Sequence, residues 1–345
     1  MNQSLNDRVT ILLVKIGDLT QFKIKEISEG ANNRVYKLET VNAKYLMKTY
    51  FKDKEDKRNR LSAEFGFSDF LWSEDIHCIP RPVVQDRENN TALFDYMEGR
   101  KISPEDVDEN LVSEALDFWV MINSRKSSTR AKRIPKASEA YFSINGHLNN
   151  VSNRLKKLNK MKIDHDVSYS AKLFVNDNLI PFWDSVKSEV ATDSALEGVN
   201  INDILHHYDR CLSPSDFGFH NVILTGSGAL KFFDFEYAGW DDPAKFVCDF
   251  FCQPEIPVSM KYFPAFSESV SAEYSDAGFH QFRMNLLLPV YQVKWCAIML
   301  NDFLSTGNKR REFSNNNGSR EKRLELQLEK SMNQFESIVG ERAEI

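Results

Sequence analysis

The sequence predicts an α+β protein with two lobes, a small antiparallel sheet followed by a mainly helical part. Its 345 residues are more than one hydrophobic core comfortably serves. Short β-type runs separated by turn residues fill the first part of the chain, and from residue 103 on most apolar residues recur at helical spacing. We therefore expect an N-lobe over residues 1–97 and a C-lobe over residues 98–345.

The predicted N-lobe begins with residues 8–18, which fit either a short amphipathic helix or a leading strand. A turn-rich segment, residues 28–33, separates the first two β-type runs. The remaining expected elements are β-type runs at 22–27, 34–38 and 45–50, a helix at 61–72, and two strands at 83–84 and 91–96 around a turn at 88–90.

The predicted C-lobe contains one β-hairpin among its helices. Apolar runs at 222–224 and 230–233 flank the turn residues 225–228, which is typical of a hairpin. Ser319 follows a polar loop and can cap the last helix. The expected helices include an amphipathic one over residues 148–161, one at 282–304 and one at 320–338.

Composition excludes several classes of function. The 44 basic and 50 acidic residues are near balance, so nothing requires a nucleic-acid partner. The five cysteines show no metal-site spacing, which favours reduced thiols and a cytoplasmic protein. The most apolar segment, residues 284–300, contains Pro289 and Lys294 and does not predict a membrane span. The composition sets no oligomeric state.

The motif that carries chemistry consists of Asp216, Asn221 and Asp234. Asp216 and Asn221 lie five residues apart just before the predicted hairpin, and Asp234 ends its second strand. Phosphoryl transfer needs such a set, with one carboxylate for the acceptor's proton and an Asn with a second carboxylate for Mg²⁺. The spacing therefore predicts a catalytic loop followed by a metal-binding aspartate.

The sequence also allows a second assignment of the motif, in which Asp209 is the catalytic base and Asp216 the metal ligand. Asp216 begins the tripeptide Asp-Phe-Gly, which holds the metal aspartate in protein kinases, and His207-Tyr208-Asp209 could then be the catalytic loop. However, Pro214 stands five residues after Asp209 and has no side-chain metal ligand. We therefore interpret Asp216 as the catalytic base.

This pattern resembles the aminoglycoside phosphotransferase and choline kinase-like family, and the resemblance covers most of the chain. The family's catalytic loop reads His-Gly-Asp-x-x-x-x-Asn, where this chain has Pro214-Ser215-Asp216 and then Asn221. The resemblance implies a protein kinase-like fold, ATP and Mg²⁺ as cofactors, and a small-molecule hydroxyl as the acceptor. It also implies that Asp216 is the base and that Asn221 and Asp234 hold the metal.

The resemblance further implies a nucleotide site in the N-lobe. Lys48 would hold the α- and β-phosphates, braced by Glu64, for which Asp69 is the main alternative. Segment 94–99 resembles the hinge between the lobes, where backbone groups pair with adenine. The residues implied to bind the nucleotide are Lys48, Glu64, Gly30, Asn32, Asn33, Asp95 and Met97.

Two alternatives follow from departures in the motif. Pro214 replaces a His that braces the loop, so a pseudokinase-like protein that binds nucleotide without turnover is the second hypothesis. A protein kinase is a weaker third, because no Gly stands two residues after Asp234 and no Ala-Pro-Glu closes an activation segment.

The acceptor stays open at this point. Carboxylates would suit an aminoglycoside and aromatic residues would suit choline. A basic cluster in the C-lobe disfavours a polycationic acceptor and favours a sugar or glycan precursor. Asp242, in an Asp-Pro-Ala segment, is interpreted as structural. The candidate carboxylates are Glu236, Asp241, Asp242 and Asp249, the aromatics Tyr237, Trp240 and Trp295, and the cluster Arg125, Lys126, Arg130, Lys132, Arg133 and Lys136.

Overall fold

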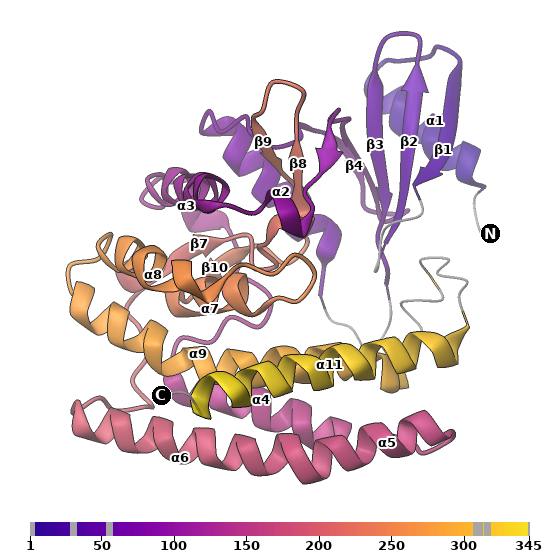
Figure 1. The fold of residues 1–345 in the computed structure, drawn as a ribbon. Coiled ribbons are helices and arrows are strands. Elements are labelled where there is room, and N and C mark those ends of the chain that lie inside the picture. Colours follow the sequence, from indigo (N-terminus) through magenta and orange to yellow (C-terminus); the bar gives the residue numbers. More distant parts are fainter. Residues whose placement is uncertain (1–3, 28–32, 53–57, 306–312, 314–318, 344–345) are drawn as a thin grey trace.

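The predicted α+β class is confirmed by the structure, a computed structural model that describes residues 4–27, 33–52, 58–305, 313 and 319–343. Figure 1 shows a small sheet at the N-terminal end of the chain and a larger helical part, with long helices in its lower layers. The candidate site lies where these two parts meet.

The N-lobe sheet is antiparallel throughout and has the strand order β1-β2-β3-β5-β4. It contains β1 (Phe22–Ile27), β2 (Arg34–Thr40), β3 (Lys44–Thr49), β4 (Pro82–Asp86) and β5 (Thr91–Asp95). Strand β3 is central, so its side chains alternate between two covered faces. These strands agree with the β-type runs of the sequence to within two residues at either end.

Two helices cover the two faces of this sheet. Helix α1 (Leu5–Lys15) packs Leu12 and Leu13 against one face, which includes Met47. Helix α2 (Arg60–Ser73) packs Leu61 against Phe94 on the other. The segment predicted at residues 8–18 as either a helix or a strand is therefore part of a helix, which spans residues 5–15. Because successive side chains of a strand point to opposite faces, Lys48 points away from α1 and toward the face that α2 covers.

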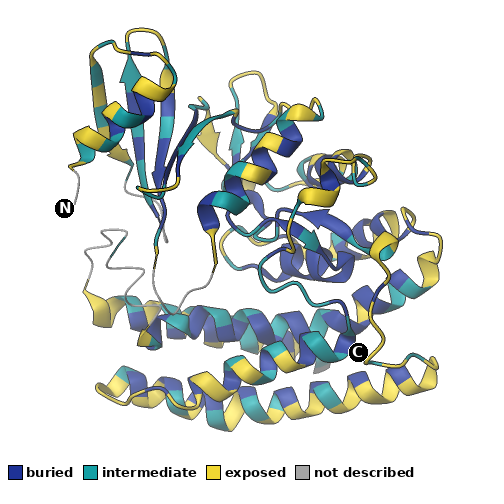
Figure 2. Cartoon of the chain, turned by 180° about the vertical axis from the view of Figure 1, so that it is seen from behind, coloured by how far each residue is buried: buried dark blue, intermediate teal, exposed yellow. Residues whose placement is uncertain are grey.

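The C-lobe is built around α9, which packs against α4, α6, α7, α8 and α11. Figure 2 shows dark buried residues in this interior and exposed residues on the outer sides of the lowest helices. The helices are α3 (Glu109–Asn123), α4 (Ile144–Leu158), α5 (Asp166–Phe174), α6 (Ile180–Leu196), α7 (Pro243–Cys252), α8 (Phe263–Ser271), α9 (Ala277–Met299) and α11 (Arg320–Ala343).

The helix predicted over residues 282–304 begins earlier and ends earlier than expected. Asp276 caps its N-terminus by accepting from the backbone N–H of Phe279, and α9 ends at Met299, where residues 300–303 tighten into a 3-10 turn. Apolar periodicity does not reveal either event, because buried residues surround α9 on most sides.

Short strands connect the lobes and support the catalytic loop. The predicted hairpin forms from β8 (Val222–Leu224) and β9 (Leu230–Phe232), and β6 (Arg100–Lys101) extends it. A second pair joins β7 (Cys211–Ser213) to β10 (Gly239–Asp241). Gly99 precedes β6 with φ +157°, and a Cβ there would lie 2.3 Å from the Ile223 side chain. This close approach requires glycine.

Two further features bear on the class of protein. No helix in the described part of the chain is long and apolar enough to cross a membrane. All five cysteines are free thiols, and four of them, including Cys248 and Cys252, are buried core residues.

Candidate active site

A cavity of about 1440 Å³ opens between the two lobes. Its walls come from β2 and β3, the hinge after β5, the β8–β9 hairpin and helices α4, α9 and α11. Lys48, Asp216, Asn221 and Asp234 all line it. The catalytic motif and the N-lobe lysine, far apart in sequence, therefore face one space.

Lys48 is buried in the central strand and has two carboxylate partners. Its Nζ lies 2.6 Å from Glu64 Oε1 on α2 and 2.8 Å from Asp234 Oδ1 after the hairpin. The Tyr50 hydroxyl donates to the other Glu64 oxygen at 2.8 Å. A buried lysine is stable in such a site because both its charge and its hydrogen-bonding capacity are met.

The charges of this group are strongly coupled. Burial alone would lower the pKa of Lys48, but the negative charges of Asp234 and Glu64 outweigh burial and raise it. Lys48 therefore stays protonated. The alternative brace, Asp69, lies on an exposed position of α2, whereas Glu64 is buried.

The predicted phosphate-covering loop is described only at Asn33, and Gly30 and Asn32 lie outside the described residues. Asn33 is buried, and its Nδ2 donates to Glu236 Oε2 at 2.7 Å. Glu236 also lies 3.5 Å from the Arg60 guanidinium. The Asn33 side chain thus joins the N-lobe to the segment that carries Asp234, and its oxygen accepts from the backbone N–H of Phe51 at 3.2 Å.

The hinge residues Asp95 and Met97 also line the cavity. The Asp95 N–H donates to the carbonyl of Arg81 at 2.9 Å, and its carboxylate pairs with the Arg81 side chain at 2.9 Å. That backbone N–H is therefore already engaged within the protein. The Asp95 side chain is thus engaged in an exposed ion pair with Arg81.

Asp216 lies in the loop before the hairpin with its side chain 34% exposed. Its carboxylate is 3.6 Å from His220 Nε2. Burial would raise the pKa of Asp216, but the facing imidazole of His220, with smaller effects from Lys245 and Lys294, holds it below its ordinary value. The group is therefore a carboxylate near neutral pH, as a base must be.

Asn221 and Asp234 flank the hairpin that brings them together. Asn221 Nδ2 donates to the Asp216 carbonyl at 2.9 Å, so its Oδ1 is the atom suited to a cation. Asp234 adopts φ +68°, which is uncommon for a non-glycine residue and concentrates at functional sites. The described residues contain no group of three or more His, Cys, Asp or Glu that could hold a metal by themselves. One amide and one carboxylate fit Mg²⁺, which usually takes further oxygens from phosphate and water.

The alternative register does not form a site. Asp209 ends a single 3-10 turn, and its carboxylate faces His280 Nε2 at 3.4 Å. Neither Asp209 nor His207 is among the residues that line the cavity.

Several acceptor candidates are placed differently from expectation. Asp241 and Asp242 are fully buried; Asp242 caps α7 and binds His147 and Arg283. Trp240 donates to the Ala131 carbonyl and does not line the cavity. None of the six residues of the basic cluster lines it either, so the cluster forms no part of the wall of this cavity. Contacts of this kind depend on tertiary packing, which local sequence does not report.

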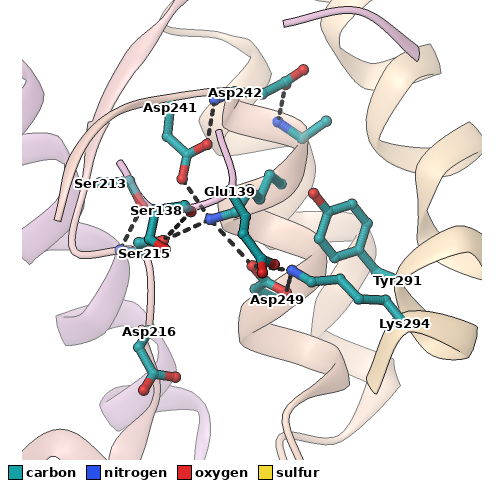
Figure 3. Close-up of polar contacts among 12 residues, drawn as sticks. Ser138, Glu139, Ser213, Ser215, Asp216, Asp241, Asp242, Asp249, Tyr291 and Lys294 are labelled. Carbon is teal, nitrogen blue, oxygen red and sulfur yellow. Dashed lines mark hydrogen bonds and ion pairs between the residues drawn. The ribbon is translucent and has the colours of Figure 1, made fainter. Parts of the chain in front are cut away.

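The side of the cavity formed by α4, α7 and α9 contains charge pairs that the sequence did not reveal. Glu139 binds the Arg154 guanidinium of α4, and Asp249 accepts from Lys294 at 2.8 Å and from Trp295 Nε1 at 2.8 Å. Glu139 has φ +54°, a second unusual backbone conformation beside the site. Figure 3 shows Glu139, Asp249 and Lys294 grouped on one side of Asp216.

Comparison with protein families supports the predicted resemblance. Residues 23–159 match the model of the phosphotransferase enzyme family. The matched segment includes Lys48, Glu64 and the hinge. This match confirms the family resemblance over that part of the chain and agrees with the predicted enzyme class, a phosphotransferase. A search of curated proteins finds no match.

Solved structures confirm the protein kinase-like fold. An ethanolamine kinase from Plasmodium vivax is 16% identical with a TM-score of 0.60, covering 95% of this chain and 88% of that one. The choline kinase LicA from Streptococcus pneumoniae is 16% identical with a TM-score of 0.57, covering 95% and 98%. Spectinomycin phosphotransferase, solved with ADP and spectinomycin, is 11% identical with a TM-score of 0.57, covering 97% and 99%.

Proposed function

We propose that this protein transfers the γ-phosphoryl group of ATP to a hydroxyl of a small molecule, with Asp216 as the base. The observation that carries the proposal is that Asp216, Asp234 and Lys48 line one cavity between the lobes. Phosphoryl transfer depends mainly on positioning and on electrostatic stabilisation, and these three groups supply both. The Asp216 carboxylate would orient the acceptor hydroxyl and take its proton.

The N-lobe would bind the nucleotide. Lys48, held by Glu64, is proposed to contact the α- and β-phosphates, beneath a loop containing Gly30, Asn32 and Asn33. The carbonyl of Asp95 and the N–H of Met97 would pair with adenine. In this proposal the lobes divide at the hinge. Residues 1–97 bind the nucleotide, and residues 98–345 bind the metal and the acceptor.

Asn221 and Asp234 are the proposed ligands of Mg²⁺. When bound, Mg²⁺ supplies positive charge that offsets the charge on the phosphates. Asp234 Oδ1 contacts Lys48 at 2.8 Å, so the same carboxylate would face both the lysine and the metal. The Asn221 amide is held in place by the Asp216 carbonyl, which couples the metal side of the site to the base.

We further propose a sugar or glycan precursor as the acceptor. An aminoglycoside acceptor would need free carboxylates, but Glu139 and Asp249, on the side of the cavity where we place the acceptor, are already paired with Arg154 and Lys294. Such pairs offer both donors and acceptors to hydroxyl groups without net negative charge. Trp295, whose indole N–H is bound to Asp249, lines the same wall and offers a surface for a sugar ring.

A transfer screen tests the proposal. Wild-type protein would be assayed with ATP or GTP and Mg²⁺ against sugars, amino alcohols and aminoglycosides, with Asp216→Asn as the matched control. We expect transfer to a sugar that the control loses. Efficient transfer to amines with sugars untouched would refute the sugar assignment. Nucleotide binding without transfer to any acceptor would refute catalysis and favour the pseudokinase-like alternative.

A further inference from the structure

The catalytic loop contains an unusual backbone at the position before the base. Ser215 has φ +69°, in the left-handed region that favours glycine. The loop pattern of the family that this chain resembles reads His-Gly-Asp, whereas this chain has Pro214-Ser215-Asp216. A serine in such a conformation persists only where its surroundings hold it there.

The contacts of Ser215 show what holds it. Its N–H donates to Ser213 Oγ at 3.0 Å, and its hydroxyl donates to the Ser138 carbonyl at 3.4 Å. The hydroxyl also accepts from Lys245 Nζ of α7 at 2.8 Å. Figure 3 shows these contacts on Ser215, with Asp216 next along the chain. A glycine could make neither of the two hydroxyl contacts.

Lys245 is itself rigidly fixed. It is 2% exposed, and its ammonium lies 2.6 Å from Asp241 and 3.4 Å from Asp249. Its ammonium donates hydrogen bonds to Asp241 and Ser215 and forms an ion pair with Asp249. Burial would lower the pKa of Lys245, but the charges of Asp241 and Asp249 outweigh burial and raise it, so the ammonium stays charged. Asp249 is anchored in turn by Lys294.

We propose that Lys245 is a positioning residue, which holds Ser215, and through it Asp216, in the catalytic arrangement in place of the missing histidine. The Lys245–Ser215 hydrogen bond ties the loop to α7, a helix that is buried along its whole length. This inference rests on the proposed function. It explains how a loop that lacks both the His and the Gly can still present an ordered base.

Ser215→Ala is the sharpest test, because it removes the hydroxyl and leaves Lys245 paired with both carboxylates. We expect kcat to fall about 10- to 100-fold while the Kd of the nucleotide changes little, since misplacement of a catalytic group affects the transition state most. Ser215→Gly should recover part of the loss, because glycine adopts this φ without strain. Ser194→Ala, at a buried serine of α6, is the control for truncation of a buried hydroxyl and should keep wild-type kcat.

The lysine is tested by Lys245→Met combined with Asp241→Asn, which removes a cation and an anion together while Asp249 keeps Lys294. Adding Ser215→Ala to this variant should cause no further loss of kcat, because the contact is already broken. Additive losses would overturn the proposal, as would a Ser215→Ala enzyme with more than about half the wild-type kcat. The variants could instead contain fewer protein molecules that bind nucleotide, with an unchanged kcat for each molecule that does. That result would show a merely structural role and would also overturn the proposal.

A second readout separates this inference from the proposed function. The same variants form a double-mutant cycle in the free energy of unfolding, which needs no substrate. If the wild type transfers phosphate to nothing, the proposed function fails, and the cycle still tests the contact. Coupling between Ser215 and Lys245 is expected in that cycle, and its absence would refute the contact itself.

Discussion

Lys48 Nζ and Asp234 Oδ1 lie 2.8 Å apart, although 186 residues separate them in the chain. This ion pair joins the central strand of the N-lobe to the end of the C-lobe hairpin. Together with Glu64 it makes a three-member charge group, of which Lys48 and Asp234 line the cavity. The proposed nucleotide site therefore depends on both lobes being in place.

Lys48→Met should weaken nucleotide binding, and Glu64→Gln should weaken it less. The two losses should not add, because both variants disrupt one ion pair, and contacting residues couple by about 0.5–3 kcal/mol. Titration calorimetry on the two variants and the double variant measures this coupling. Asp69→Asn, on the exposed side of the same helix, is the control and should bind like wild type. Full additivity would show that Glu64 is not the functional partner of Lys48.

Asp216→Asn should leave nucleotide affinity nearly unchanged and lower turnover. A positioned general base contributes roughly 10²–10⁴-fold to the rate. Steady-state kinetics with an acceptor from the screen measures the loss, and Asp209→Asn controls for the alternative register. If Asp209→Asn abolishes turnover and Asp216→Asn does not, the register proposed for the motif is wrong.

Asp234→Ala should remove the dependence of nucleotide affinity on Mg²⁺, because it deletes a carboxylate that suits a hard cation. Asn221→Ala should reduce this dependence less, since a neutral amide oxygen is the weaker ligand. The measurement is the Kd of ATP with Mg²⁺ and with EDTA for each variant. Equal Kd values in the two conditions for wild-type protein would contradict the metal assignment.

The contribution of His147 to stability should be lost as the pH drops below about 6.5, the ordinary pKa of histidine. His147 is buried, with Nε2 3.1 Å from Asp242 and Nδ1 2.8 Å from the Tyr291 hydroxyl. Burial lowers the pKa of His147, and its bond to Asp242 only partly opposes this. The unfolded chain therefore takes up the proton first, so the stability contribution is present above that pH and lost below it.

The measurement is urea unfolding of the wild type and of His147→Gln between pH 8 and pH 5. The variant should be less stable at pH 8 and should show a flatter dependence on pH in this window. Asp242 also has a lowered pKa, because Arg283 and His147 outweigh its burial, but its contribution is lost only at more acid pH. Equal slopes for the two proteins would contradict the role of His147.

Much of the fold followed from local patterns. Alternating apolar residues and turn residues located the strands of the N-lobe and the β8–β9 hairpin, since these features act within a few residues of the chain. The spacing of Asp216, Asn221 and Asp234 indicated that they lie close together, because a hairpin returns the chain to the same end of the sheet, and all three line the cavity. Their roles stay predictions.

Other features could not be read from the chain. The choice between helix and strand for residues 8–18 depended on the sheet face that α1 covers. The earlier start of α9 depended on a cap outside its apolar pattern. Asp241 and Trp240 were candidates to contact the acceptor, but neither lines the cavity. Which side chains face a cavity depends on the packing of the whole chain, and Asp241 is fully buried.

The sequence by itself determined which residue types are available for phosphoryl transfer and on which local elements they lie. Only the tertiary structure decided which charges neutralise one another: Lys48 with Asp234, Glu139 with Arg154, and Lys245 with Asp241. The physical reason is that an ion pair depends on distances of a few ångströms between side chains, and residues distant in the chain reach those distances only through the packing of helices and sheets.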